Sequence, residues 1–178
     1  MTSVDNIQSI VSNMSLQEQV LELLMLDVRY FTSDDGKVYP LTSLPPEIEA
    51  ILNEYPVGGA ILFRENIAQL DDVLRLTNSL QKNVKFGRLV AIDQEGGRVS
   101  RLPAGFTIFP PCGQLGQCNS SELAYSAAAT IAKELRVVGI NMNMSPVLDV
   151  NSNPDNPVIG DRAFGATPDL VGAMGLAT

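Results

Sequence analysis

The sequence contains no histidine and no tryptophan, and only two of its 178 residues are cysteine. Histidine is the usual general acid or base in enzymes and a very common metal ligand. Chemistry that depends on a histidine of this chain is therefore excluded. Cys112 and Cys118 have no further cysteine and no histidine near them. The sequence therefore predicts neither a metal site nor a disulfide, and it fits a reduced, cytoplasmic protein.

Basic residues are also scarce, with 12 Lys and Arg against 20 Asp and Glu, which gives a net charge of −8. Binding to a nucleic-acid backbone needs concentrated Lys and Arg, so we expect no nucleic-acid partner. No apolar run approaches the length of a membrane span, and the first residues lack the pattern of a signal peptide, so we expect no membrane association. The composition is otherwise that of an ordinary globular protein, and the length suits one domain over residues 1–178.

Apolar runs and helical spacings alternate along the chain. The apolar runs predict four strands, near residues 23–28, 57–63, 89–93 and 140–147. Apolar residues at helical spacing predict helices over 4–14, from the capping box Ser15–Glu18, from Pro45, over 70–80, over 123–138 and from Thr167. Residues 31–43 and 151–168 are predicted as loops, and residues 103–118 form a stretch rich in glycine and proline. This alternation predicts an α/β fold with a parallel sheet and helices on its outer face.

The segment with the most chemical information follows the third predicted strand. Asp93, Glu95, a Gly96-Gly97 pair, Arg98 and Arg101 come directly after the apolar run that ends at Ile92. Glycines let the backbone bend sharply, so these charged side chains can point into one cleft. Ligand sites in parallel α/β folds lie at the carboxyl ends of the strands. The pattern predicts a polar-ligand site there, with a solvated surface turn as the alternative.

Four segments together resemble one known family. They are Gly58-Gly-Ala-Ile-Leu-Phe-Arg-Glu-Asn66, Ile92-Asp-Gln-Glu-Gly-Gly-Arg-Val99, Gly139-Ile-Asn-Met-Asn-Met-Ser-Pro-Val-Leu-Asp-Val150 and Ile159-Gly-Asp-Arg-Ala-Phe-Gly165. In this order and spacing they resemble the barrel domain of glycoside hydrolase family 3, and within it most closely the bacterial β-N-acetylhexosaminidases. The resemblance covers nearly the whole chain.

The resemblance implies a TIM-barrel-type fold of (β/α) units. A complete barrel has eight strands and about 250 residues, so four predicted strands correspond to half of a barrel. It also implies hydrolysis of terminal β-linked N-acetylglucosamine with retention of configuration, and it implies no cofactor and no metal. Asp93 matches the carboxylate that holds two sugar hydroxyls, and Arg101 and Arg162 match arginines of the same subsite. An ion pair with its neighbour Asp161 is the alternative role for Arg162.

The catalytic motifs of the family are missing from this sequence. In the family the next strand carries Lys-His-Phe-Pro-Gly-His-Gly, followed by an Asp-His acid/base pair and later by a nucleophilic aspartate. A retaining mechanism needs one group that attacks and one that protonates. The resemblance therefore assigns no catalytic residue here, and it leaves open whether the chain is an enzyme by itself. Asp27, Glu65, Glu95 and Asp149 are strand-end acids that could still form a pair by chance.

These observations support two functional hypotheses of different classes. The first is the N-terminal half of a β-N-acetylhexosaminidase that binds sugar alone and hydrolyses it when a second half completes the barrel. The second is a non-catalytic sugar-binding or self-assembling half-barrel. An open half-barrel exposes two strand edges and an apolar inner face, so we expect a homo-oligomer or a complementing half. A nucleotide-binding domain is a weaker third hypothesis, because no glycine-rich phosphate motif follows a strand and Gly113–Gly116 is predicted as a turn.

Overall fold

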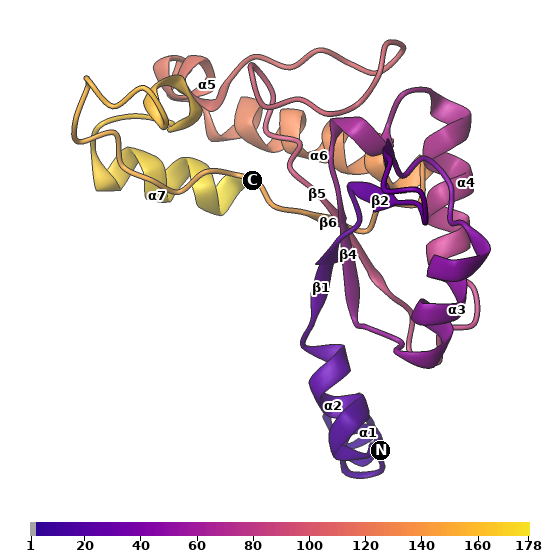
Figure 1. The fold of residues 1–178 in the computed structure, drawn as a ribbon. Helices are drawn as coiled ribbons and strands as arrows, with labels where there is room; N and C mark the ends of the chain where they lie inside the picture. The colour runs from indigo at the N-terminus through magenta and orange to yellow at the C-terminus, as the bar shows by residue number, and fades with distance from the viewer. Residues whose placement is uncertain (1–2) are drawn as a thin grey trace.

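A four-stranded parallel sheet forms the centre of the structure, a computed structural model that describes residues 3–178 (Figure 1). All three strand pairings are parallel. The strands lie side by side in chain order: β1 (Met25–Asp27), β4 (Gly59–Leu62), β5 (Leu89–Ile92) and β6 (Met142–Asn143). The prediction of four sequential parallel strands in an α/β fold is therefore confirmed.

Helices connect the strands and extend beyond the sheet. They are α1 (Ser3–Ser12), α2 (Leu16–Glu22), α3 (Pro46–Glu54), α4 (Leu70–Leu80), α5 (Cys112–Cys118), α6 (Ser121–Val137) and α7 (Pro168–Ala177), with short 3₁₀ turns η1 (Arg64–Asn66) and η2 (Gly160–Arg162). The predicted capping box forms at α2, where the Ser15 amide donates to the Glu18 carboxylate at 2.7 Å and the Glu18 amide donates to the Ser15 hydroxyl at 3.2 Å. No helix of the described residues is both long and apolar enough to cross a membrane.

The main core lies between one face of the sheet and helices α3, α4 and α6. Leu62 and Ile92 from this face are fully buried together with Leu76 of α4. Because side chains alternate along a strand, their neighbours point to the opposite face. That inner face is less covered, and Leu89 on it is 49% exposed. Leu89 and the partly exposed Ile61 on this face therefore remain open to further packing, whereas Ala91 on the same face is fully buried.

A second, smaller core joins α5, α6 and α7 at the side of the molecule away from α3 and α4 (Figure 1). Its buried members are Cys112, Ala124, Phe164, Val171 and Met174. Phe164 comes from the segment between η2 and α7, so this cluster fixes the loop that follows β6 against α5. The same loop carries Arg162.

The segment 31–43 is not simply a loop, and the prediction for it was wrong. Tyr30–Thr32 (β2) and Val38–Pro40 (β3) form an antiparallel hairpin. Its turn places Gly36 at φ 78°, a left-handed conformation that glycine adopts easily. The signal was present in the sequence, since an Asp-Gly turn separates two short runs rich in aromatic and β-branched residues.

The interpretation of Gly113–Gly116 as a turn was also wrong, because these residues lie within helix α5. Glycine is a poor helix former, so helix propensity does not predict a helix here. Its presence is explained by packing, since a Cβ atom at Gly116 would collide with the backbone carbonyl of Phe164. Close approach of α5 to this segment therefore requires glycine.

The fourth strand is shorter than the predicted range 140–147, and asparagine side chains add to its backbone pairing with β5. The Asn141 side-chain amide accepts a hydrogen bond from the Val90 amide at 2.8 Å and donates to the Arg88 carbonyl at 3.0 Å. Asn143 makes both of its bonds with the backbone of Gln94, two residues after β5. Side chains thus satisfy backbone groups within β5 and on either side of it.

Two glycine substitutions test the packing of α5. We expect Gly116→Ala to destabilise the fold by about 1–3 kcal/mol, because the new methyl group displaces the Phe164 backbone. The midpoint of thermal unfolding should fall by roughly 2–4 °C for each kcal/mol of lost stability. The control, Gly172→Ala in α7, places its methyl group in open space and should be neutral or stabilising. Equal unfolding midpoints for both variants would contradict the close approach.

The two cysteines are free thiols with different environments, Cys112 buried and Cys118 exposed. Burial, and secondarily the Glu95 carboxylate, raise the pKa of the Cys112 thiol, so it stays protonated and unreactive at neutral pH. We expect a disulfide reagent to titrate one thiol per chain, Cys118, in the native state and both thiols after denaturation. Cys118→Ser should abolish the native reaction, and a native reaction that persists in this variant would contradict the assignment.

Candidate functional site

The predicted polar cluster lies at the carboxyl end of β5, the strand between β4 and β6. Asp93 is the first residue after the strand, and its Oδ2 atom lies 3.7 Å from a terminal nitrogen of Arg101. Their side chains are 28% and 25% exposed. The structure therefore brings Asp93 and Arg101 together and leaves both accessible to a ligand.

The buried side chain of Gln94 determines where Arg101 lies. Its Oε1 atom accepts hydrogen bonds from the backbone amides of Arg101 and Leu102, at 2.7 and 3.4 Å, and its Nε2 atom donates to the Ser100 hydroxyl at 3.0 Å. The Gln94 backbone is held in turn by the Asn143 side chain through two bonds of 3.0 Å. The loop that carries Arg101 is thus anchored to both β5 and β6.

Arg162 reaches the same site from η2. Its Nε and one terminal nitrogen donate to the two oxygens of Glu95, at 2.9 and 2.7 Å, and its other terminal nitrogen donates to the Val158 carbonyl at 3.2 Å. The hydrogen bonds to Glu95 are the main cause that raises the pKa of Arg162, and the charges of Asp93 and Asp149 add to it. The guanidinium therefore stays charged beside Asp93.

The alternative ion pair between Arg162 and Asp161 does not form. Asp161 pairs instead with Arg98, whose Nε lies 3.3 Å from its carboxylate. Arg98 also donates to the carbonyls of Pro157, Val158 and Ile159, at 2.9, 2.6 and 3.1 Å. From the sequence, Arg98 is predicted only to be a charge beside the glycine pair, because nothing in local spacing indicates a partner so far along the chain.

An aromatic ring at the end of β4 supports two guanidinium groups. The Arg29 guanidinium lies 3.6 Å and that of Arg101 lies 5.9 Å from the centroid of the Phe63 ring. Arg29 follows β1 and forms an ion pair with Asp27 at 2.8 Å. The ends of β1, β4 and β5 therefore all contribute to this face of the sheet, and Phe63 and Arg29 are contributions that sequence analysis missed.

Most of the other strand-end acids already have side-chain partners. Asp27 binds Arg29, Glu95 binds Arg162, and Glu65 accepts a hydrogen bond from the Tyr30 hydroxyl at 3.2 Å. Within residues 3–178 no group of three or more Cys, Asp and Glu side chains is placed to hold a metal ion. The arrangement at the end of β5 is suited to binding a polar organic ligand through carboxylate and guanidinium groups.

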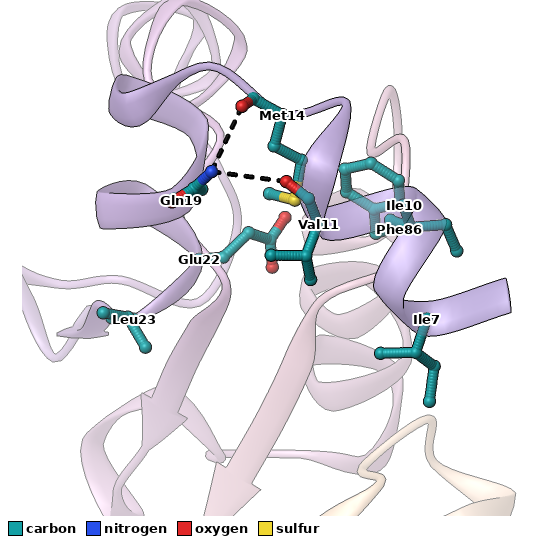
Figure 2. Close-up of a pocket in the computed structure, with 8 residues that line it drawn as sticks. All are labelled: Ile7, Ile10, Val11, Met14, Gln19, Glu22, Leu23 and Phe86. Carbon is teal, nitrogen blue, oxygen red and sulfur yellow. Dashed lines mark hydrogen bonds between the residues drawn. The ribbon is translucent and has the colours of Figure 1, made fainter. Parts of the chain in front are cut away.

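A cavity of about 540 Å³ lies at the opposite end of the sheet (Figure 2). It is bounded by α1, α2 and Phe86, which precede the amino ends of β1 and β5, and its lining is mainly apolar. The Gln19 side chain closes one side by donating to the carbonyls of Val11 and Met14. This cavity is therefore separate from the cluster around Asp93.

Comparison with known proteins agrees with this geometry. The sequence model described as glycosyl hydrolase family 3 N terminal domain matches residues 15–178. The chain is 40% identical over 168 residues to beta-hexosaminidase A of Pseudoalteromonas piscicida, a match that covers 86% of this chain and 28% of that protein.

Two solved structures extend the comparison. A family 3 beta-N-acetylglucosaminidase from Paenibacillus superposes with a TM-score of 0.79 at 39% identity, over 92% of this chain and 30% of that one. NagZ from Neisseria gonorrhoeae, solved with N-trifluoroacetyl-D-glucosamine, gives a TM-score of 0.74 at 30% identity, over 86% of this chain and 45% of that one.

The chain spans less than half the length of each of these three relatives. Its four-stranded sheet does not close into a barrel within the described residues, which is consistent with the predicted half-barrel. The resemblance inferred from the sequence motifs is confirmed: the chain belongs to glycoside hydrolase family 3 and corresponds to the N-terminal region of its β-hexosaminidases.

Proposed function

We propose that residues 1–178 are the N-terminal portion of the (β/α)8 barrel of a β-N-acetylhexosaminidase and that this portion binds a terminal, β-linked N-acetylglucosamine unit. Asp93 accepts hydrogen bonds from sugar hydroxyls, and Arg101 and Arg162 donate to sugar oxygens. The observation that carries the proposal is the position of Asp93 at the end of β5, 3.7 Å from Arg101, with the Arg162–Glu95 ion pair formed two residues further along the chain. A charged acceptor binds hydroxyl groups more strongly than a neutral one.

The charge balance of the site favours an uncharged ligand. Each of the three arginines that sequence and structure assign to the loops after β5 and β6 has a carboxylate within 4.0 Å: Arg98 has Asp161, Arg101 has Asp93, and Arg162 has Glu95. An anionic ligand would meet no uncompensated positive charge among them. A sugar fits better, because its hydroxyls can donate to the carboxylate and accept from the guanidinium groups at once.

Hydrolysis is proposed for the complete protein rather than for these 178 residues. A retaining mechanism needs two groups on either side of the glycosidic bond. The histidine loop and the aspartate that the family resemblance assigns to these roles do not occur in the sequence. The relatives named hexosaminidase are more than twice as long as the matched region. We therefore infer that this region contributes sugar binding and that the remaining part of the barrel contributes catalysis.

We also propose a cytoplasmic location, because both cysteines are free and Cys118 is an exposed thiol. Free exposed thiols persist in the reducing cytosol and are oxidised in secretory compartments.

Removal of the Asp93 carboxylate tests the proposed site. Hydrogen bonds to a charged group contribute roughly 1.5–3 kcal/mol each, so Asp93→Ala should weaken affinity for N-acetylglucosamine about tenfold or more. Calorimetric titration with the sugar measures this, and Glu122→Ala on the exposed first turn of α6 is the control that should bind like the unmodified chain. Equal affinity for the unmodified chain and Asp93→Ala would remove Asp93 from the site.

We further propose that two copies of the chain associate through their inner sheet faces. In the described residues β1 pairs only with β4 and β6 only with β5, so one edge of each outer strand is unpaired. Eight strands are the number at which side chains just fill a barrel interior, and two copies would supply eight. The partly exposed Leu89, and Ile61 and Met142 on the same face, would be buried by such an arrangement.

Sedimentation velocity at micromolar concentration tests this association. We expect a species of about twice the 19.1 kDa of one chain. Leu89→Glu should shift the population to monomer, because it places a charge on the apolar inner face. Ile108→Glu changes an equally apolar side chain that is 95% exposed outside the sheet, and it should leave the dimer intact. A compact, stable monomer of the unmodified chain would contradict the proposal.

A further inference from the structure

The Glu95–Arg162 pair is the most completely formed ion pair of the site. Both carboxylate oxygens accept hydrogen bonds from Arg162, at 2.7 and 2.9 Å. The Glu95 side chain is 5% exposed, whereas that of Arg162 is 25% exposed. Glu95 is therefore covered by its partner, and a ligand in the site can touch Arg162 but has little access to Glu95.

The pair fixes the plane of the guanidinium group. A guanidinium carries five N–H donors in one rigid plane, and bidentate binding to a carboxylate leaves it no freedom to rotate. Two donors of Arg162 bind Glu95 and a third binds the Val158 carbonyl. One donor on each terminal nitrogen remains, and both have directions set by the pair.

The backbone holds both partners in place. Glu95 directly follows Gln94, just after β5, and its amide donates to the Val99 carbonyl at 2.9 Å. Arg162 lies on the turn η2, where its amide donates to the Ile159 carbonyl at 2.9 Å and the following segment is fixed by the buried Phe164. The Arg162 side chain extends from this turn to the end of β5, and its guanidinium group there is bound by Glu95.

We propose that Glu95 is a positioning residue for sugar binding: it holds the Arg162 guanidinium in the orientation in which its two remaining donors meet the sugar. This inference rests on the proposed function of the site and adds a residue that does not itself contact the sugar. Arg98 supports the same loop through its backbone carbonyls, whereas Glu95 binds the Arg162 guanidinium group itself, at Nε and one terminal nitrogen.

A double-mutant cycle separates positioning from general stability. Glu95→Gln keeps the shape of the side chain but loses the charge and one acceptor. We expect it to weaken N-acetylglucosamine binding about tenfold in calorimetric titration. In an Arg162→Lys background, where the bidentate geometry is already lost, the same change should alter affinity less than about twofold, because neighbours that act through each other are not additive. Glu122→Gln, an exposed glutamate on α6, is the matched control and should have no effect.

A spectroscopic measurement reports the pair directly. The Arg162 Nε–H resonance, assigned by its disappearance in Arg162→Lys, should move toward the position of a solvated arginine in Glu95→Gln. Glu95→Asp, which retains the charge with a shorter side chain, should recover part of the sugar affinity. Thermal unfolding monitored by circular dichroism identifies any variant that fails to fold. If Glu95→Gln does not fold, the sugar affinity of Glu95→Asp, compared with that of the unmodified chain, is the measurement that tests the positioning role.

The outcomes distinguish the two proposals. Measurable sugar binding by the unmodified chain, together with unchanged affinity in Glu95→Gln or additive effects in the cycle, would overturn the positioning role alone. Absence of any affinity for N-acetylglucosamine in the unmodified chain would overturn the proposed function and this inference with it. Weakened binding, coupling to Arg162 and a displaced Nε–H resonance together would support the positioning role.

Discussion

The need to satisfy buried polar groups at the carboxyl end of β5 governs the arrangement of the site. Once this strand end is covered by neighbouring loops, a buried amide, carbonyl or charged group without a partner is costly. Most of these groups have a partner, and the buried Nε atoms of Arg29 and Arg101 are exceptions. Asn143 supplies partners for the backbone of Gln94, the Gln94 side chain supplies them for the loop up to Leu102, and Glu95 binds Arg162. Four side chains thus connect three separate parts of the chain.

This network explains how a short sheet can present an ordered polar site. β5 contributes only four residues, and β6 only two, so strand pairing alone would hold the following loops weakly. Hydrogen bonds of the polar side chains hold the loops that follow the strands in place. Asp93 can then remain partly exposed between guanidinium groups, because the residues on both sides of it are fixed by buried contacts.

The same sheet has an inner face that is only partly covered. Its outer face packs on α3, α4 and α6, whereas the inner face retains partly exposed apolar side chains and two unpaired edges in the described residues. The site and the open face are therefore properties of one architecture: parallel strands place all carboxyl ends on one side, and four of them are too few to enclose an interior. Relatives more than twice as long carry additional chain beyond the matched region.

The sequence by itself determined the strand order, most helices and the residues gathered after β5. Apolar periodicity and the capping box at Ser15 are local signals, and local geometry follows from them directly. The motifs also carried enough information to indicate the family. Hairpin β2–β3 could have been recognised from its Asp-Gly turn. Helix α5 could not be predicted, because its glycines lower its helix propensity. The reason for glycine at position 116 is its close packing against Phe164, which only the tertiary structure shows.

Only the tertiary structure decided the partners of the charged residues. Arg162 lies beside Asp161 in the sequence yet binds Glu95, while Asp161 binds Arg98. Pairing of charges depends on which groups the fold buries together, because a buried carboxylate without a partner is far more costly than an exposed one. Glu95 is buried and Asp161 is exposed, so the arginine that reaches the interior pairs with Glu95. That burial arises from contacts between β5 and a loop that follows β6, and no spacing within either segment encodes it.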